Sequence, residues 1–208
     1  MLKQGLFITF EGPEGSGKST HSKLLYDYLR KKRFEVVHTR EPGGTVIGEK
    51  IRKVLLDPKN KDMDVVCEML LYMSARIQIV KRVILPALKK GKIVICDRFT
   101  DATLAYQGYA GGIDLKIIED VANLVTRGIA PDITFLLDID TKLGLLRSGR
   151  DKDRMERKSL MYHNKVRKGY LSIAKREPDR VKIISAVGDI SEAREKIRKI
   201  VLHKLGKV

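Results

Sequence analysis

The feature that most constrains this chain is a glycine-rich run near its N-terminus, residues 12–19, with the sequence G-P-E-G-S-G-K-S. The run fits the pattern G-x-x-x-x-G-K-[ST], and it stands between an apolar run typical of a strand and a stretch with helical periodicity. Glycines at these positions let successive backbone N–H groups point at one anion at the start of a helix. A chance glycine-rich turn is the alternative, but it does not account for the flanking strand and helix. The run therefore predicts a strand, loop and helix that hold the phosphates of a nucleoside triphosphate.

Two side chains of this run supply the charge and the metal ligand that such a site needs. The ammonium group of Lys18 can reach the β- and γ-phosphates, and the hydroxyl group of Ser19 can bind Mg²⁺, the expected cofactor. The residues that we expect to hold the phosphates of ATP are Gly12, Pro13, Glu14, Gly15, Ser16, Gly17, Lys18, Ser19 and Thr20.

Short apolar runs alternate with stretches of helical periodicity along the rest of the chain. The predicted strands lie at 7–10, 35–38, 92–96, 133–137 and 181–184, and the clearest helices at 18–32, 63–89 and 189–205. Strands buried on both faces that alternate with helices form a parallel sheet with right-handed crossovers. We therefore predict an α/β fold of the P-loop NTPase type, with a five-stranded parallel sheet, helices on both faces and one domain over residues 1–208.

The segment 147–158 differs from the rest of the chain in composition, since most of its residues are charged. It carries Arg147, Arg150, Asp151, Lys152, Asp153, Arg154, Glu156, Arg157 and Lys158. Such a composition leaves little to bury, so we predict a small solvent-facing lid, mobile without nucleotide, that brings an arginine to the phosphates.

The overall charge is strongly positive, with 42 Lys and Arg against 26 Asp and Glu and a formal net charge of +16. A polyanion partner is one interpretation, but the basic residues are scattered, which favours a solvated surface. No apolar run approaches the ~18 residues of a membrane span, and Cys67 and Cys96 have no paired spacing. We expect a cytoplasmic protein with no nucleic-acid or membrane partner.

A metal-binding acid is expected at the end of a strand. Asp97 and Arg98 end the strand 92–96, at the edge of the sheet where open α/β folds bind ligands. A structural salt bridge is the alternative for this pair. Asp138 and Asp140 end another strand, but Asp140 is equally typical of a helix N-cap.

Several segments together resemble the thymidylate kinases, and the resemblance covers essentially the whole chain. They are the loop at 10–20, T-R-E-P-G-G-T at 39–45, L-L-Y-M-S-A-R at 70–76, D-R-F-T-D-A-T-L-A-Y-Q-G at 97–108, P-D at 131–132, D-R-M-E at 153–156 and V-R-K-G-Y-L at 166–171. The loop alone indicates only a superfamily, whereas the segments at 39–45 and 105–108 are specific.

The resemblance implies transfer of the γ-phosphoryl group of ATP to dTMP by an enzyme that is typically a homodimer. It implies that Arg98 grips the acceptor phosphate, that Asp97 supports Mg²⁺, and that Tyr106 disfavours a 2′-hydroxyl. The acceptor-binding residues so implied are Arg40, Tyr72, Arg76, Arg98, Thr103, Tyr106, Gln107 and Tyr170, with Tyr72 stacking on the base and Arg76 contacting thymine. The loop at 185–186 resembles the segment that contacts adenine. On periodicity alone, Tyr72 could equally be core and Arg76 a surface cation.

The sequence departs from the family pattern at Tyr72, usually Phe, at Phe99, usually Tyr, and at Ala102, usually Ser. Its loop has no arginine at positions 13, 14 or 16, so it resembles the bacterial subclass that supplies the cation from its lid. The expected catalytic residues are Glu14, Lys18, Asp97, Arg98, Arg150 and Arg154.

Two other functions fit parts of the sequence. Another nucleoside monophosphate or deoxynucleoside kinase fits the loop but not the segments at 39–45 and 105–108. A P-loop ATPase that binds nucleic acid fits the charge, but it needs a clustered basic stripe or interleaved surface aromatics, and neither is evident.

Overall fold

The computed structural model describes residues 5–149 and 152–206 of the chain. Five strands form one parallel sheet in the order β2-β3-β1-β4-β5. They are β1 (Phe7–Glu11), β2 (Val36–Arg40), β3 (Ile93–Asp97), β4 (Ile133–Asp138) and β5 (Val181–Ser185), close to the five predicted ranges. Because β1 is central, the loop that follows it lies at the middle of the carboxyl edge of the sheet.

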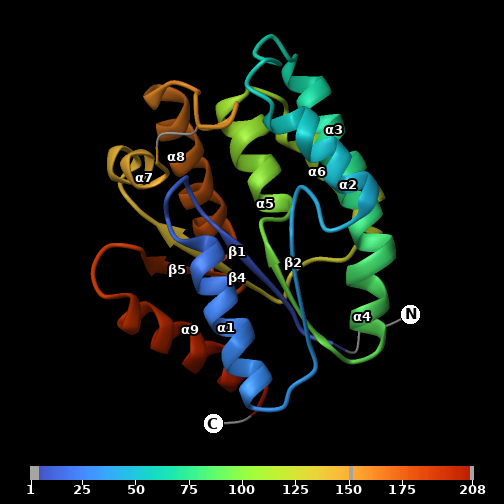
Figure 1. Cartoon of the computed structure of the whole chain (residues 1–208), viewed down its shortest axis with the longest axis vertical. Coiled ribbons are helices and arrows are strands. Elements are labelled where there is room, and N and C mark those ends of the chain that lie inside the picture. The colour runs from blue at the N-terminus through green and yellow to red at the C-terminus, as the bar shows by residue number, and fades with distance from the viewer. Residues whose placement is uncertain (1–4, 150–151, 207–208) are drawn as a thin grey trace.

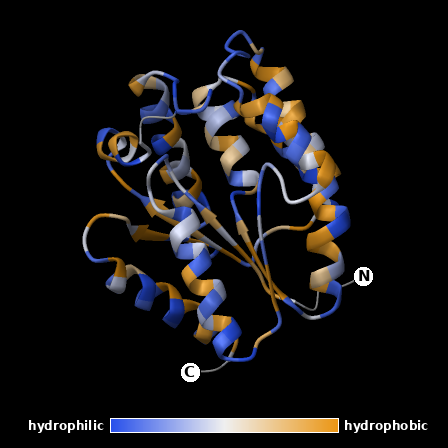
Figure 2. Cartoon of the chain, in the orientation of Figure 1, coloured by the Kyte–Doolittle hydropathy of each residue, from blue (hydrophilic) through white to orange (hydrophobic). Residues whose placement is uncertain are grey.

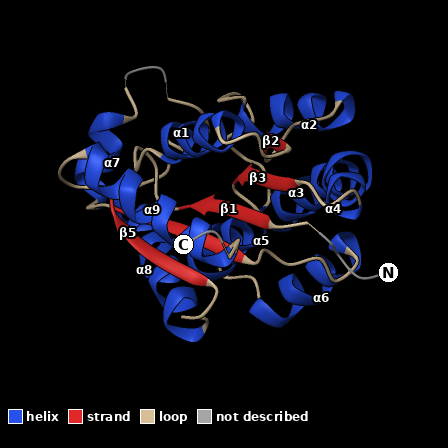
Figure 3. Ribbon diagram, turned by 90° about the horizontal axis from the view of Figure 1, so that it is seen from below, coloured by secondary structure: helices blue, strands red, loops and turns tan. Residues whose placement is uncertain are grey.

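Helices cover both faces of this sheet, as Figure 3 shows from below. One face carries α1 (Lys18–Lys31) and α9 (Ile190–Lys204). The other carries α3 (Val65–Ile79), the π-helical turn η1 (Val80–Ile84), α4 (Leu85–Lys89), α5 (Thr100–Thr103), the π-helical segment η2 (Leu104–Ala110), α6 (Leu115–Thr126) and α8 (Leu160–Arg176). Two further helices, α2 (Val46–Leu56) and α7 (Thr141–Arg147), pack on α3 and α8 respectively. The predicted α/β fold is confirmed.

The side chains of β1 point alternately to the two faces of the sheet. Ile8 and Phe10 pack toward α1 and α9, and Phe7 packs toward α4 on the opposite face. Figure 2 shows the resulting apolar sheet between helices whose outer sides are hydrophilic. Thr9 and Glu11 share the face of Phe7 and are fully buried, so their polar atoms must find partners inside the protein.

Several helices begin at a residue whose side chain caps the first turn. The predicted helix 63–89 is continuous in space but consists of α3, η1 and α4, and Asp64 caps its first turn. Asp140 accepts the backbone N–H groups of Lys142 and Leu143 at the start of α7, so its interpretation as an N-cap is confirmed. Figure 1 shows α7 and α8 beside the carboxyl ends of β1 and β4.

The lid segment is partly anchored, which corrects the expectation that it buries nothing. Arg150 and Asp151 lie outside the described residues. Arg154 and Met155 are 3% and 4% exposed, and Met155 belongs to the core formed with α3 and α8. The composition alone gave a wrong prediction, because a guanidinium group can be buried when a carboxylate and carbonyl groups pair with it.

A search of the described residues for membrane-spanning helices finds none that is both long enough and apolar enough.

Candidate active site

The phosphate loop follows β1 in a shape that only glycine permits at two positions. Gly12 has φ +140°, and a Cβ atom there would lie 2.3 Å from the carbonyl oxygen of Leu137. Gly15 has φ +66°, and its Cβ atom would lie 1.9 Å from the carbonyl oxygen of Gly144 on α7. The loop therefore packs its backbone directly against β4 and α7.

Lys18 begins α1 and turns back across this loop. Its Nζ donates to the carbonyl oxygen of Pro13 at 2.7 Å, and the side chain is buried. Burial, and after it Arg98, lowers the pKa of Lys18 to about 8, against the opposing effect of Glu14 and Asp97. An anionic phosphate in the loop supplies the negative charge that stabilises the ammonium form.

Ser19 and Asp97 meet at the carboxyl edge, because α1 starts beside the end of β3. The Ser19 hydroxyl donates to the Asp97 carboxylate, and Ser19 is exposed. A hydroxyl group and a carboxylate are oxygen ligands of the kind that Mg²⁺ prefers, and this metal commonly takes only one or two protein ligands beside phosphates and water. The two residues fit the Mg²⁺ that the sequence predicts at this site.

Arg98 lies on the other side of the loop and is held there by Glu14. Its Nη2 donates to both carboxylate oxygens of Glu14 at 2.9 Å, and its guanidinium lies 5.1 Å from the centre of the Tyr106 ring. The Tyr106 hydroxyl also donates to Glu14, at 2.6 Å. Burial opposes ionisation of Glu14, but Arg98, Lys18 and Tyr106 outweigh it and lower the pKa of that carboxyl to about 2. Tyr170 accepts from Nη1 of Arg98 at 3.2 Å.

One cavity of about 370 Å³ joins the phosphate loop to α3, α5 and the lid segment. Of the residues that the sequence singles out, it is lined by Glu14, Gly15, Gly17, Lys18, Ser19, Thr20, Arg40, Tyr72, Asp97, Arg98, Thr103, Tyr106 and Gln107. The other lining residues are Glu41, Pro42, Arg52, Leu56, Ala102, Ser148, Asp153, Met155 and Glu156. Residues that are far apart in sequence thus surround one space, of a size that suits a nucleotide.

Two residues that are predicted to bind the acceptor nucleotide, Arg40 and Gln107, are each held by a carboxylate. Arg40 ends β2 and pairs with Glu49 of α2 at 3.1 Å, with both side chains about half exposed. Gln107 is buried and donates its amide to Glu68 at 2.6 Å.

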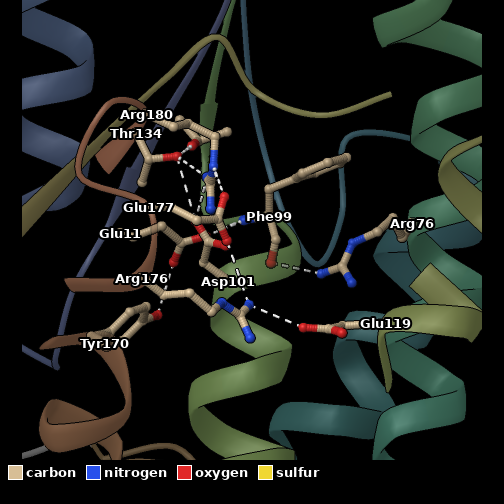
Figure 4. A network of polar contacts seen from close by, with 11 residues as sticks. Glu11, Arg76, Phe99, Asp101, Glu119, Thr134, Tyr170, Arg176, Glu177 and Arg180 are labelled. Carbon is tan, nitrogen blue, oxygen red and sulfur yellow. Dashed lines mark hydrogen bonds and ion pairs between the residues drawn. The ribbon is translucent and has the colours of Figure 1, made fainter. Parts of the chain in front are cut away.

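Arg76 and Tyr170 are not among the described residues that line the cavity. Arg76 is 1% exposed, and its guanidinium donates to Glu41 at 2.7 Å, to the Thr103 hydroxyl at 3.0 Å and to the Phe99 carbonyl at 2.9 Å. Figure 4 shows this last contact. The interpretation of Arg76 as a surface cation is therefore wrong. Its contact with thymine stays a prediction.

The lid arginines divide into three cases. Arg147 is exposed at the end of α7 and donates to the carbonyl oxygen of Ala186, in the loop expected at adenine. Arg150 lies outside the described residues. Arg154 is buried away from the phosphate loop and donates to the Leu55 carbonyl at 2.7 Å, so it is not a free cation in this arrangement.

Three buried acids escaped the sequence reasoning, namely Glu11, Glu41 and Glu68. Each is at most 4% exposed and is held by an arginine, a tyrosine or an amide from a distant segment. Only Glu68 carried a signal, because it is an acid inside the apolar run 65–71; Glu11 and Glu41 stand next to glycine and proline, where an acid is ordinarily exposed.

Comparison with known proteins agrees with this geometry. The family model described as thymidylate kinase matches residues 10–197. A thymidylate kinase of Symbiobacterium thermophilum is 47% identical over 197 residues, which cover 94% of this chain and 92% of that protein. One from Wolbachia sp. subsp. Brugia malayi is 52% identical over 184 residues, which cover 88% of this chain and 87% of its own. The crystal structure of the thymidylate kinase from Ehrlichia chaffeensis superimposes with a TM-score of 0.78 at 38% identity, covering 95% of this chain and 98% of that one. Because these matches run through every segment that lines the cavity, the chain belongs to the thymidylate kinase family.

Proposed function

We propose that this chain transfers the γ-phosphoryl group of ATP to dTMP, giving ADP and dTDP, in the cavity between the phosphate loop and α3. The observation that carries the proposal is that two cations, Lys18 and Arg98, line a single nucleotide-sized cavity. Transfer between two phosphates concentrates negative charge, so two positioned cations supply the stabilisation that the reaction needs.

On the ATP side, the backbone of residues 12–17 holds the phosphates and Lys18 follows the transferring group. Ser19 and Asp97 are proposed to hold Mg²⁺. The metal supplies neutralisation of phosphate charge when bound. The loop at 185–186 is proposed to contact adenine, and its hydrogen bond with Arg147 supports a lid that reaches from the adenine end toward the phosphates.

On the acceptor side, Arg98 is proposed to leave Glu14 and grip the phosphate of dTMP. Tyr72 is half-buried in the cavity wall and presents its ring to the base, while Tyr106 stands against the sugar. Arg40, Thr103 and Gln107 complete the acceptor side of the wall. Arg76 and Tyr170 are not among the described residues that line the cavity, but they position residues that are. Arg76 donates to Thr103, and Tyr170 accepts from Arg98.

We propose a cytoplasmic homodimer that pairs through α3. Val66, Leu70 and Ile77 are 46%, 49% and 37% exposed on this helix, and their spacing places them along one side. A second copy of the chain is the occupant that fits such an unpartnered apolar face. Light scattering should give twice the chain mass, and Leu70→Glu should give the mass of one chain.

The test of the activity is stoichiometry. ADP release from ATP should require dTMP, and one dTDP should appear for each ADP. Release that responds to DNA and not to dTMP would support a nucleic-acid-dependent ATPase, the rival from another functional class.

A further inference from the structure

Glu11 is the last residue of β1, and its carboxylate is fully buried beside the phosphate loop. It is not among the described residues that line the active-site cavity, so it does not meet the reactants. Oε1 accepts the backbone N–H of Phe99 at 2.6 Å, and Oε2 accepts the hydroxyl of Tyr170 at 2.8 Å. Figure 4 shows Glu11 between Phe99 and Tyr170.

The first of these contacts fixes the backbone around Arg98. Arg98 has φ +69°, a left-handed conformation that is strained for a residue other than glycine. Its own N–H donates to the carbonyl oxygen of Phe10 at 2.9 Å, and the next N–H, of Phe99, donates to Glu11. Two consecutive residues of β1 therefore clamp the peptide groups on both sides of Arg98.

The second contact orients the side chain of Arg98. The Tyr170 hydroxyl donates to Oε2 of Glu11, so its proton points at that carboxyl group. The lone pairs of that hydroxyl then face Arg98, whose Nη1 donates to it at 3.2 Å. Glu11 thus reaches the guanidinium through one intervening hydroxyl group.

A second buried carboxylate, that of Asp101, lies near Glu11 and is itself paired with an arginine. Burial, and after it the nearby Asp101, raises the pKa of Glu11, while Arg98, Tyr170 and the Phe99 N–H oppose this shift. Asp101 is itself held by Arg180 through contacts of 2.7 and 2.9 Å. This pair, visible in Figure 4, reduces the repulsion between the two carboxylates.

From these contacts we infer that Glu11 is a positioning residue for phosphoryl transfer, which holds Arg98 by both its backbone and its guanidinium. The inference rests on the proposed role of Arg98 at the acceptor phosphate. It predicts that Glu11 matters only while Arg98 is present.

A double-mutant cycle tests this dependence. Glu11→Gln keeps the volume and can still accept from Phe99, but its amide N–H cannot receive the Tyr170 hydroxyl. It should lower kcat by about 10- to 100-fold, the effect of leaving the buried Tyr170 hydroxyl without its acceptor. The KM for ATP should stay within about twofold, because the loop on the ATP side is untouched. In the Arg98→Ala background the same change should alter kcat by less than about threefold.

Thr9→Val is the matched control, because Thr9 lies on the same strand face and is fully buried. Within the described part of the chain, its hydroxyl forms a hydrogen bond to Thr134 alone, at 2.7 Å. It should lower the melting temperature and leave kcat unchanged. If Glu11→Gln fails to fold, Tyr170→Phe removes the bridging hydroxyl instead and should also lower kcat only when Arg98 is present.

The outcomes separate this inference from the function on which it rests. An equal loss of kcat with and without Arg98 would show that Glu11 acts elsewhere. An unchanged kcat in Glu11→Gln, with a large loss in Arg98→Ala, would overturn the inference and leave the proposed function standing. An unchanged kcat in Arg98→Ala would overturn the proposed role of Arg98 itself.

Discussion

Arg154 and Glu68 form a buried ion pair, 2.5 Å between Nη1 and Oε2, that joins the end of the lid segment to α3. Their side chains are only 3% and 2% exposed. The backbone N–H of Arg154 also donates to the carbonyl oxygen of Leu56, at the end of α2. The lid segment is therefore fixed at Arg154 to both α2 and α3.

Removing Arg154 should affect stability before chemistry. Arg154→Ala leaves Glu68 buried without its cation, which costs about 3–5 kcal/mol of unfolding free energy. For a chain of this size the melting temperature should fall by roughly 10 °C. Arg157→Ala, an exposed change in the same segment, should shift it by less than about 2 °C. An unchanged melting temperature together with lost turnover would instead assign Arg154 to the reactants.

Lys18→Ala should remove the cation that follows the transferring phosphoryl group. Loss of one positioned charge in such a site lowers kcat by about 10²–10³-fold. The affinity for dTMP, measured by calorimetry, should stay nearly unchanged because Lys18 faces the phosphate loop. Lys23→Ala, an exposed lysine on the same helix, is the matched control. A variant that keeps more than about a third of wild-type turnover would contradict this role.

The cation that the phosphate loop lacks should come from Arg147 or Arg150. Single alanine substitutions should lower kcat more than they raise the dissociation constant of dTMP, since a lid arginine acts on the transferring group. The measurement compares steady-state kinetics with equilibrium dTMP binding for each variant. Normal turnover in both variants would place the missing cation elsewhere.

Acceptor choice should follow the order dTMP, then dUMP, with dCMP and UMP far behind. The ring of Tyr106 is held by packing in the cavity wall, so it should resist a 2′-hydroxyl and favour dUMP over UMP by at least about tenfold in kcat/KM. Tyr106→Phe keeps the ring and should retain the preference, whereas Tyr106→Ala should reduce it. Equal kcat/KM values for dTMP and dCMP would contradict the thymine-recognition part of this order.

His163 should make the protein sensitive to acid. It is 1% exposed, and neither ring nitrogen has a hydrogen-bond partner within the described part of the chain. Burial lowers its pKa below the ordinary 6.5, aided by Arg98 and Lys152 and opposed by Glu14 and the backbone of Glu156. The unfolded chain therefore binds more protons as the pH falls through about 6.5, and the native state loses stability there.

His163→Phe should remove both effects. The imidazole of His163 packs edge-on against the ring of Tyr162, and a phenylalanine ring fits the same place. The phenylalanine ring buries no unpaired nitrogen. The unfolding free energy at pH 7 should rise by about 1–3 kcal/mol. Calorimetry at pH 7, 6 and 5 should show the advantage growing with acidity. An advantage that shrinks toward pH 5 would contradict this account, and the exposed His203→Gln should show no change.

The sequence by itself determined the fold class and the identity of the phosphate site. Both depend on local patterns: the apolar runs of the strands, the glycines at 12 and 15, and the order of strand, loop and helix along the chain. These signals need no knowledge of distant residues, because backbone conformation and strand burial are decided within a few positions.

Only the tertiary structure decided which charged side chains are buried and what each one holds. Arg76 and Glu41 are 35 positions apart, and Arg98 and Glu14 are 84 apart, so no spacing along the chain connects them. Composition made Arg154 part of a solvated lid, whereas the fold brings Glu68 and the carbonyl groups of α2 to it. The free energy of a buried charge depends on the partners that the fold delivers, and that property belongs to the assembled core rather than to any segment.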